Sequence, residues 1–155
     1  MIQIEGHDSL QKQNYFYINI RDLMATVQYD LGWKPLFSIV SQQTGKQKDF
    51  IPFNMVTTNA QRYLKFEILV MTGNEAPVIG WINLGTKNFP YGLYNVTVRN
   101  NASSTNLDPN FAHAPIWSGI MNVYEANTNK STKFEEYEEE QVQQVYITNE
   151  YQDTP

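Results

Sequence analysis

The chain has 155 residues, of which 41% are hydrophobic and only 17% charged, with a formal net charge of −5. Residues 131–155 hold seven acids and one base, a net of −6, which leaves +1 for residues 1–130. A nearly neutral body lacks the basic stripe that nucleic-acid binding requires. The absence of cysteine excludes disulfides and thiolate chemistry, and no apolar run reaches the roughly 20 residues of a membrane-spanning helix.

The first residues, MIQIEGHDSLQKQ, have neither the basic start nor the apolar stretch of a secretory signal, so we expect a protein made in the cytoplasm. Ile2 and Ile4 alternate with polar neighbours. We therefore expect residues 1–12 to form an N-terminal arm whose Ile2 and Ile4 pair as an extra strand, on another subunit in one interpretation.

Strict alternation of apolar and polar residues then recurs along the chain and predicts β-strands. In YFYINIRD, Phe16, Ile18 and Ile20 share one face while Tyr17 faces the other way. PLFSIVSQQ follows, and TGKQ at 44–47 predicts a turn into KDFIPF. YLKFEILVM places Phe66, Ile68 and Val70 on one face, and VIGWINLG is a shorter strand that ends at Gly85.

Two further strands enclose a polar loop. FPYG at 89–92 predicts a corner, after which Tyr94, Val96 and Val98 face the core. IWSGIMNVYE places Trp117, Met121 and Val123 on one side, with a bulge or a close backbone approach at Gly119. VQQVYITN predicts a last strand.

Seven or eight short strands separated by Gly, Pro and Asn turns favour an all-β antiparallel β-sandwich, immunoglobulin-like or jelly-roll-like, with extended N- and C-terminal arms. We expect the sandwich over residues 13–125. Residues 126–155 then form a linker, an acidic segment and a C-terminal strand. The acidic segment is either a solvated face or an arm that docks on a partner through Glu135, Glu136, Tyr137, Glu138, Glu139 and Glu140.

No catalytic or metal-binding pattern stands out. His7 and His113 are the only histidines, and neither lies in a spacing that places it beside a nucleophile or in a zinc site. Asn106, Asp108 and Asn110 have the i, i+2, i+4 spacing of calcium ligands, but the loop lacks further carboxylates and a glycine, so we interpret it as an ordinary Asp-Pro turn. We expect no catalytic residue, metal or cofactor.

Aromatic residues are the remaining candidates for a binding site. Trp81, Trp117 and Tyr94 alternate with polar residues as core positions do, whereas Trp33 and Tyr91 lie beside turns. If the protein binds a carbohydrate, we expect the contacts to come from Trp33, Tyr91, Asn106 and Asp108.

Residues 63–124 resemble a small module that recurs among structural proteins of tailed bacteriophages. The resemblance rests on RYLKFEILV, the hairpin strand YGLYNVTVRN, the loop SSTNLDP and the returning strand SGIMNVYE, and QVYITNE fits a final strand. It implies a virion protein of the capsid-auxiliary or the fibre- or tail-associated type, assembled in the bacterial cytoplasm.

We therefore expect a non-enzymatic virion protein, an auxiliary or decorating capsid component. Its expected partners are other virion proteins (capsid, connector or fibre subunits) or further copies of itself, with no nucleic acid and no membrane. The alternative is a β-sandwich module that binds a carbohydrate or a host receptor.

Overall fold

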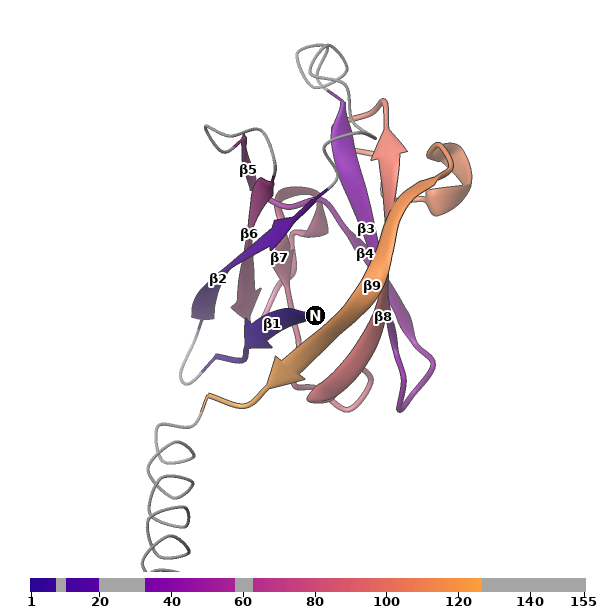
Figure 1. Ribbon diagram of the computed structural model, residues 1–155. Helices are drawn as coiled ribbons and strands as arrows, with labels where there is room; N and C mark the ends of the chain where they lie inside the picture. Colours follow the sequence, from indigo (N-terminus) through magenta and orange to yellow (C-terminus); the bar gives the residue numbers. More distant parts are fainter. Residues whose placement is uncertain (8–10, 20–32, 58–62, 127–155) are drawn as a thin grey trace, which may run out of the picture.

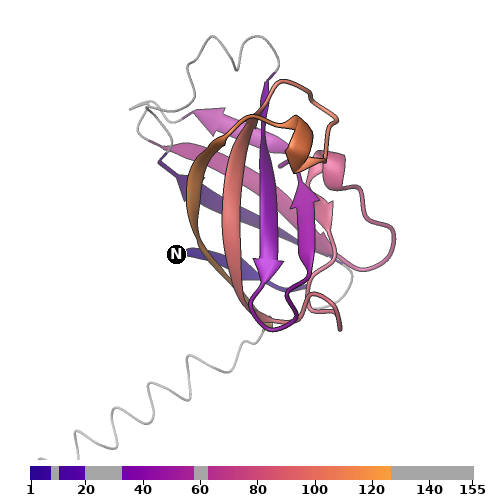
Figure 2. The ribbon, with the colours of Figure 1, turned by 90° about the vertical axis from the view of Figure 1, so that its right-hand side faces the viewer.

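A computed structural model of the chain describes residues 1–7, 11–19, 33–57 and 63–126. These residues form two β-sheets that stack face to face (Figures 1 and 2). The five-stranded sheet has the spatial order β1 (Ile2–Glu5), β9 (Pro115–Tyr124), β8 (Gly92–Asn101), β3 (Lys34–Ser41) and β4 (Gln47–Phe50). The four-stranded sheet has the order β2 (Gln11–Ile18), β6 (Leu64–Met71) and β5 (Asn54–Thr57), with β7 (Trp81–Ile82) also pairing with β6.

The predicted all-β sandwich is confirmed. The described residues form nine strands: β1 is the extra strand expected from Ile2 and Ile4, and β5 is not predicted by the alternation. Two pairings, β1 with β9 and β6 with β7, are parallel, and the others are antiparallel. The helical segments of the described residues, η1 (Pro77–Ile79) and η2 (Pro109–Phe111), are too short to cross a membrane.

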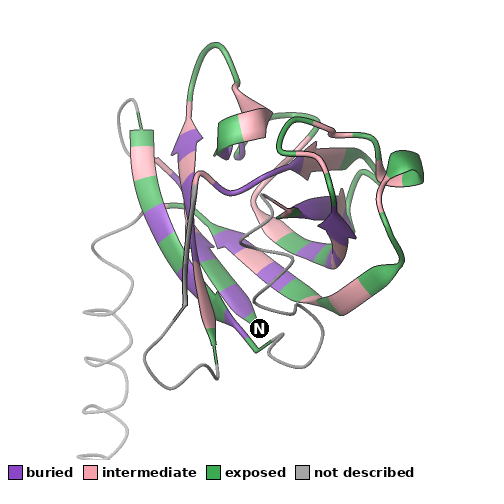
Figure 3. Ribbon diagram, turned by 90° about the horizontal axis from the view of Figure 1, so that it is seen from above, coloured by how far each residue is buried: buried purple, intermediate pink, exposed green. Residues whose placement is uncertain are grey.

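The core lies between the two sheets, and the alternation correctly identifies most of the side chains that fill it. Figure 3 shows buried and exposed residues alternating along the strands. At the centre of the core, four phenylalanines from the two sheets contact one another: Phe16, Phe37, Phe50 and Phe66. Phe37 stacks on Phe50 with ring centroids 5.4 Å apart, and its edge meets Phe16 at 5.6 Å and Phe66 at 5.1 Å. The buried strand residues predicted from the sequence are Phe16, Ile18, Phe66, Ile68, Val70, Tyr94, Val96, Val98, Met121 and Val123.

Trp81 and Trp117 are both predicted as core residues, but the structure buries them to different extents. Trp81 was expected in the core, but it is exposed, because β7 spans two residues and Ile82 is the one that points inward. Trp117 is half-buried against the core, and its indole lies over Gly119, so the predicted close approach at Gly119 is confirmed. The bulge in this strand pair lies between Val98 and Arg99.

The extra strand predicted at Ile2 and Ile4 is confirmed, but the prediction of a separate N-terminal arm is wrong for residues 2–5. These residues form β1, which pairs with β9 of the same chain, and Ile2 and Ile4 are buried in the core. Neither side chain is available to a partner. The alternation at Ile2 and Ile4 is the same for a strand of this sheet and for an arm, so only the fold distinguishes the two.

Side chains close the open side of the sandwich between β1 and β2. The Asn14 amide accepts a hydrogen bond from Glu5 N–H and donates one to Glu5 C=O, both at 2.8 Å. Lys12 adds an ion pair with the Glu5 carboxylate at 3.0 Å. Asn14 thereby occupies backbone groups of an edge strand that otherwise attract a further strand.

Tyr94 fixes the start of β8. Its buried hydroxyl donates a hydrogen bond of 2.6 Å to Pro90 C=O, four residues upstream, an arrangement known in β-sandwiches as a tyrosine corner. Burial raises the pKa of Tyr94 from 10.0 to about 12, although a hydrogen bond with Ser41 lowers it in part. The folded state therefore holds this proton more tightly than the unfolded chain does.

Alkaline pH is expected to destabilise the fold through Tyr94. The stabilisation from its raised pKa is fully present below pH 10, the pKa of the tyrosine in the unfolded chain, and is lost as the pH rises toward 12. The total loss is about 2–3 kcal/mol, at 1.36 kcal/mol per pKa unit. Urea unfolding of wild type and Tyr94→Phe at several pH values checks this. The variant is less stable by about 0.5–1.5 kcal/mol at pH 8. The gap should narrow or reverse by pH 12, and a gap that stays constant contradicts the prediction.

Candidate interaction site

The predicted ligand residues lie at opposite ends of β8. Trp33 and the loop with Asn106 and Asp108 are at the end where Lys34 pairs with Asn101, whereas Tyr91 directly precedes the first residue of β8. Trp33 contacts this loop through His113: the imidazole ring stacks on the Trp33 indole, with 4.8 Å between the ring centroids. The four residues thus do not form one site.

The loop with Asn106 and Asp108 is held by its own hydrogen bonds. The Asn106 side chain accepts from Asp108 N–H at 3.0 Å and donates to Asp108 C=O at 3.0 Å. The Asp108 carboxylate accepts from Asn110 N–H at 2.9 Å and so caps η2. These contacts support the interpretation as a structural turn, and the described residues contain no cluster of three His, Cys, Asp or Glu that could hold a metal.

Tyr91 has little free ring surface to offer a ligand. Its ring packs between Gly6 and Gly85, and a methyl group on either glycine would approach a ring atom to 2.6 Å. The ring also contacts the main core. Tyr91 is therefore a packing residue that joins the N-terminal strand to the loop before β8.

The outer face of the four-stranded sheet carries exposed aromatic side chains. Tyr15 and Tyr17 are 49% and 58% exposed, and Trp81 is 39% exposed. In the strand register Tyr17 lies opposite Lys65, and Leu69 lies opposite Trp81. We define Tyr15, Tyr17, Lys65, Leu69 and Trp81 as the tyrosine face.

One basic and one acidic group lie among the rings of the tyrosine face. The Lys65 ammonium sits 4.3 Å from the centroid of the Tyr15 ring and 3.5 Å from a carboxylate oxygen of Glu67. The outer face of the five-stranded sheet is more mixed, because neutral polar side chains such as Ser118, Asn95 and Asn122 lie along it together with Leu93, Ile120 and Tyr124, each 39% exposed. Large rings with few charges are typical of contact surfaces. The alternation predicts that Tyr17 points outward, but no pattern in the sequence indicates this face.

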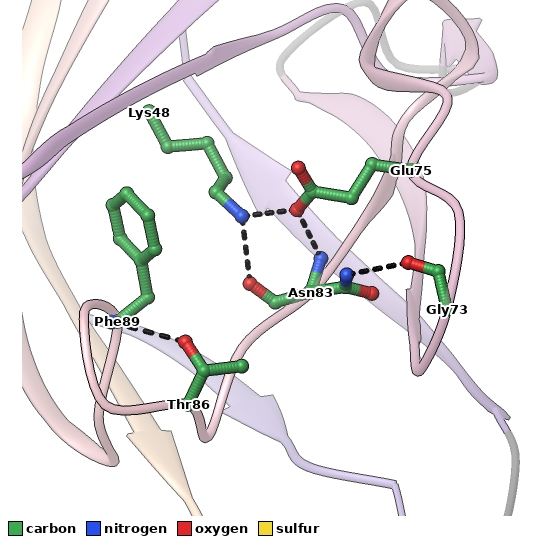
Figure 4. Close-up of polar contacts among 6 residues, drawn as sticks. All are labelled: Lys48, Gly73, Glu75, Asn83, Thr86 and Phe89. Carbon is green, nitrogen blue, oxygen red and sulfur yellow. Dashed lines mark hydrogen bonds and ion pairs between the residues drawn. The ribbon is translucent and has the colours of Figure 1, made fainter.

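A lysine–carboxylate cluster closes the side of the sandwich between β4 and β7 (Figure 4). Lys48 lies opposite the core residue Ile39, so its side chain points between the sheets, and only 9% of it is exposed. Its ammonium pairs with Glu75, donates to Asn83 C=O at 2.8 Å and sits 4.2 Å from the centre of the Phe89 ring. The Glu75 carboxylate also accepts from Asn83 N–H at 2.6 Å. Because its ammonium is engaged in these contacts, we assign Lys48 a structural role. It is an inward-pointing charge on the edge strand β4, a feature that hinders pairing of that edge with another chain.

Replacing Lys48 by methionine is expected to lower the free energy of unfolding by about 1–3 kcal/mol, because the Glu75 carboxylate and Asn83 C=O lose a charged donor. Chemical denaturation measures the change. Lys46→Met, at an exposed position of the adjoining turn, is the matched control, with an expected effect within about 0.5 kcal/mol. Equal effects of the two substitutions would show that the cluster contributes no stability.

Phe111 is the most exposed of the large hydrophobic side chains described, at 81%. It ends η2, which projects beside the sandwich next to β9 (the orange turn in Figure 1). No pattern in the sequence indicates Phe111, because a single exposed phenylalanine in a loop has no periodic signature. The acidic candidates Glu135, Glu136, Tyr137, Glu138, Glu139 and Glu140, like the predicted last strand, lie outside the described residues.

Comparisons with known proteins give no family. No family model matches the chain, and no curated protein matches it. Among solved structures, it is similar to a protein from Bacteroides vulgatus described as a "putative glycoside hydrolase", with a TM-score of 0.34 and 10% identity. The match covers 84% of this chain but spans only 17% of that protein. A likeness this weak supports no inference about fold or activity.

Proposed function

We propose that this protein is a non-enzymatic structural component of a bacteriophage virion, an auxiliary or decorating capsid protein that binds neighbouring virion subunits. Two lines of reasoning support the proposal. Residues 63–124 resemble a module of phage structural proteins, and the sandwich presents the tyrosine face as a surface suited to protein contact. The partners are capsid, connector or fibre subunits or further copies of the chain. Contact through the acidic segment 135–140, which lies outside the described residues, remains a prediction.

The tyrosine face is the observation that carries the proposal. Tyrosine, tryptophan and methionine are enriched in protein interfaces, whereas charged residues are depleted from interface centres. Tyr15 and Tyr17 lie on β2 and Trp81 lies on β7, and both strands pair with β6, so a flat partner surface can contact all three. Lys65 and Glu67 pair with each other at 3.5 Å and leave little net charge between the rings.

Quantitative peptide mass spectrometry of purified particles tests the proposal, with the coat protein as internal reference. The phage that encodes the chain is grown with wild type or with Tyr15→Ser, Tyr17→Ser and Trp81→Ser combined. We expect wild type at a fixed copy number and the triple variant absent, although it folds. Leu93→Ser with Ile120→Ser is the matched control on the outer face of the other sheet and should be incorporated normally. Wild type missing from particles would overturn the proposal.

Carbohydrate binding is the second candidate, because the exposed rings of Tyr15 and Tyr17 share their face of β2 with the exposed amides of Gln11 and Gln13. Rings that stack on sugars beside amide groups suit a glycan. Saturable binding to a surface glycan that is lost in Tyr17→Ser, together with absence from the particle, would favour this candidate over the structural one.

A further inference from the structure

We propose that residues 102–114, the Phe111 loop, form a second contact in which the Phe111 ring inserts into an apolar pocket of a neighbouring virion protein. The inference rests on the proposed function and deepens it by assigning a separate surface and the chemistry of its partner. The loop lies outside the tyrosine face, because it connects β8 and β9 of the five-stranded sheet.

Exposure alone does not carry this inference, because single exposed apolar side chains are common on protein surfaces. What distinguishes Phe111 is that its backbone is fixed. Phe111 N–H donates to Asp108 C=O at 3.1 Å, and His113 N–H donates to Asn100 C=O at 2.9 Å. The Asp108 carboxylate caps the turn through Asn110 N–H, and Pro109 restricts the first position of η2.

Contacts on both sides of η2 anchor the loop to the sandwich. On one side, the Asn101 side chain donates to Asn106 C=O at 3.1 Å, and Ser103 Oγ accepts from Asn106 N–H at 3.1 Å. On the other side, the His113 ring stacks on Trp33. The backbone that carries the exposed ring is therefore already in place before binding, so less backbone entropy is lost when a partner buries the ring.

The residues around Phe111 favour a protein pocket over a lipid bilayer. Apart from His113, residues 100–114 carry one ionisable side chain, Asp108, and otherwise contain Asn, Ser, Thr, Ala, Leu, Pro and Phe. Surface binding to anionic membranes depends on Lys and Arg around the inserted apolar residue. An aromatic centre with a hydrogen-bonding rim that carries a single carboxylate, Asp108, is instead the composition of a protein interface. The partner is therefore expected to offer an apolar pocket edged by uncharged polar groups.

A competition experiment tests the inference. Wild type and Phe111→Ser are expressed together in cells infected by the phage that encodes the chain, and mass spectrometry compares the two versions of the peptide spanning residue 111 in lysate and in purified particles. A buried aromatic anchor predicts depletion of Phe111→Ser from particles by about tenfold or more. Phe111→Leu, which keeps an apolar side chain, should be depleted less. Leu93→Ser is the control and should keep its lysate ratio.

The outcomes separate the two proposals. Equal incorporation of Phe111→Ser and wild type overturns the inference and leaves the proposed function intact. Absence of wild type from particles overturns both. If wild type, but not Phe111→Ser, floats with phosphatidylcholine vesicles, the loop binds lipid. That result would also overturn the inference of a protein pocket. Unchanged thermal unfolding of the variant establishes that its depletion comes from lost contact and not from misfolding.

Discussion

Replacing Phe37 by alanine is expected to lower the free energy of unfolding by about 3–5 kcal/mol, the range for truncation of a buried phenylalanine. The Phe37 ring contacts Phe50 of its own sheet, and Phe16 and Phe66 of the opposite sheet. Alanine leaves a cavity between the layers that the neighbouring rings cannot fill without leaving their own contacts. The transfer free energy of the ring and the cost of the cavity therefore add.

Urea unfolding followed by circular dichroism measures this loss, and Phe111→Ala is the matched control. Both substitutions remove the same atoms, but Phe111 is 81% exposed whereas Phe37 is buried. We expect Phe111→Ala to change the free energy of unfolding by less than about 0.5 kcal/mol. Losses of equal size would mean that the four phenylalanines do not form the centre of the core. The same control also shows whether Phe111 is dispensable for folding, as the inference about its loop requires.

Replacing Gly80 by alanine is expected to lower the free energy of unfolding by about 2–5 kcal/mol from two sources. Gly80 ends η1 with φ +73°, a left-handed conformation that costs about 1–2 kcal/mol for other residues. A Cβ there would also lie 2.8 Å from Phe53 N and 3.1 Å from Ile51 C=O oxygen. These atoms belong to the backbone and cannot rotate away, so overpacking adds about 1–3 kcal/mol.

Gly45→Ala separates the two sources. Gly45, in the turn between β3 and β4, has a similar φ of +68°, but no atom lies within 4 Å of its added Cβ. We expect it to lose only the conformational part, about 1 kcal/mol. Denaturant midpoints of the two variants provide the comparison. Similar losses for Gly45→Ala and Gly80→Ala would disprove the close approach of the backbone at Gly80.

Local sequence patterns are sufficient to predict the all-β class and to identify which residues of most strands face the core. Successive side chains of a strand point to opposite faces whatever its neighbours are, so alternation identifies Phe16, Phe66 or Val96 as buried without knowledge of the pairing. The corner before β8 was predictable for a similar local reason, since Pro90 fixes its own φ and Gly92 permits a positive φ.

The tertiary structure alone decided which strands pair and which polar groups meet. Ile2 and Ile4 alternate as an arm would, but β1 pairs with β9, more than a hundred residues along the chain. Trp81 alternates as a core residue would, but its neighbour Ile82 took the inward position. Asn14 and Lys48 close the two sides of the sandwich through partners on other strands and loops, Glu5 for Asn14 and Glu75 for Lys48.

The candidate surfaces also depended on tertiary structure. Tyr17 was predictable as an outward residue, but its place beside Lys65 and near Trp81 requires the pairing of β2 and β7 with β6. Trp33 meets His113 only because β3 and β8 are neighbours. The physical reason is general: the period of a strand specifies the face of each residue, whereas pairing partner and register depend on long-range packing that no local pattern records.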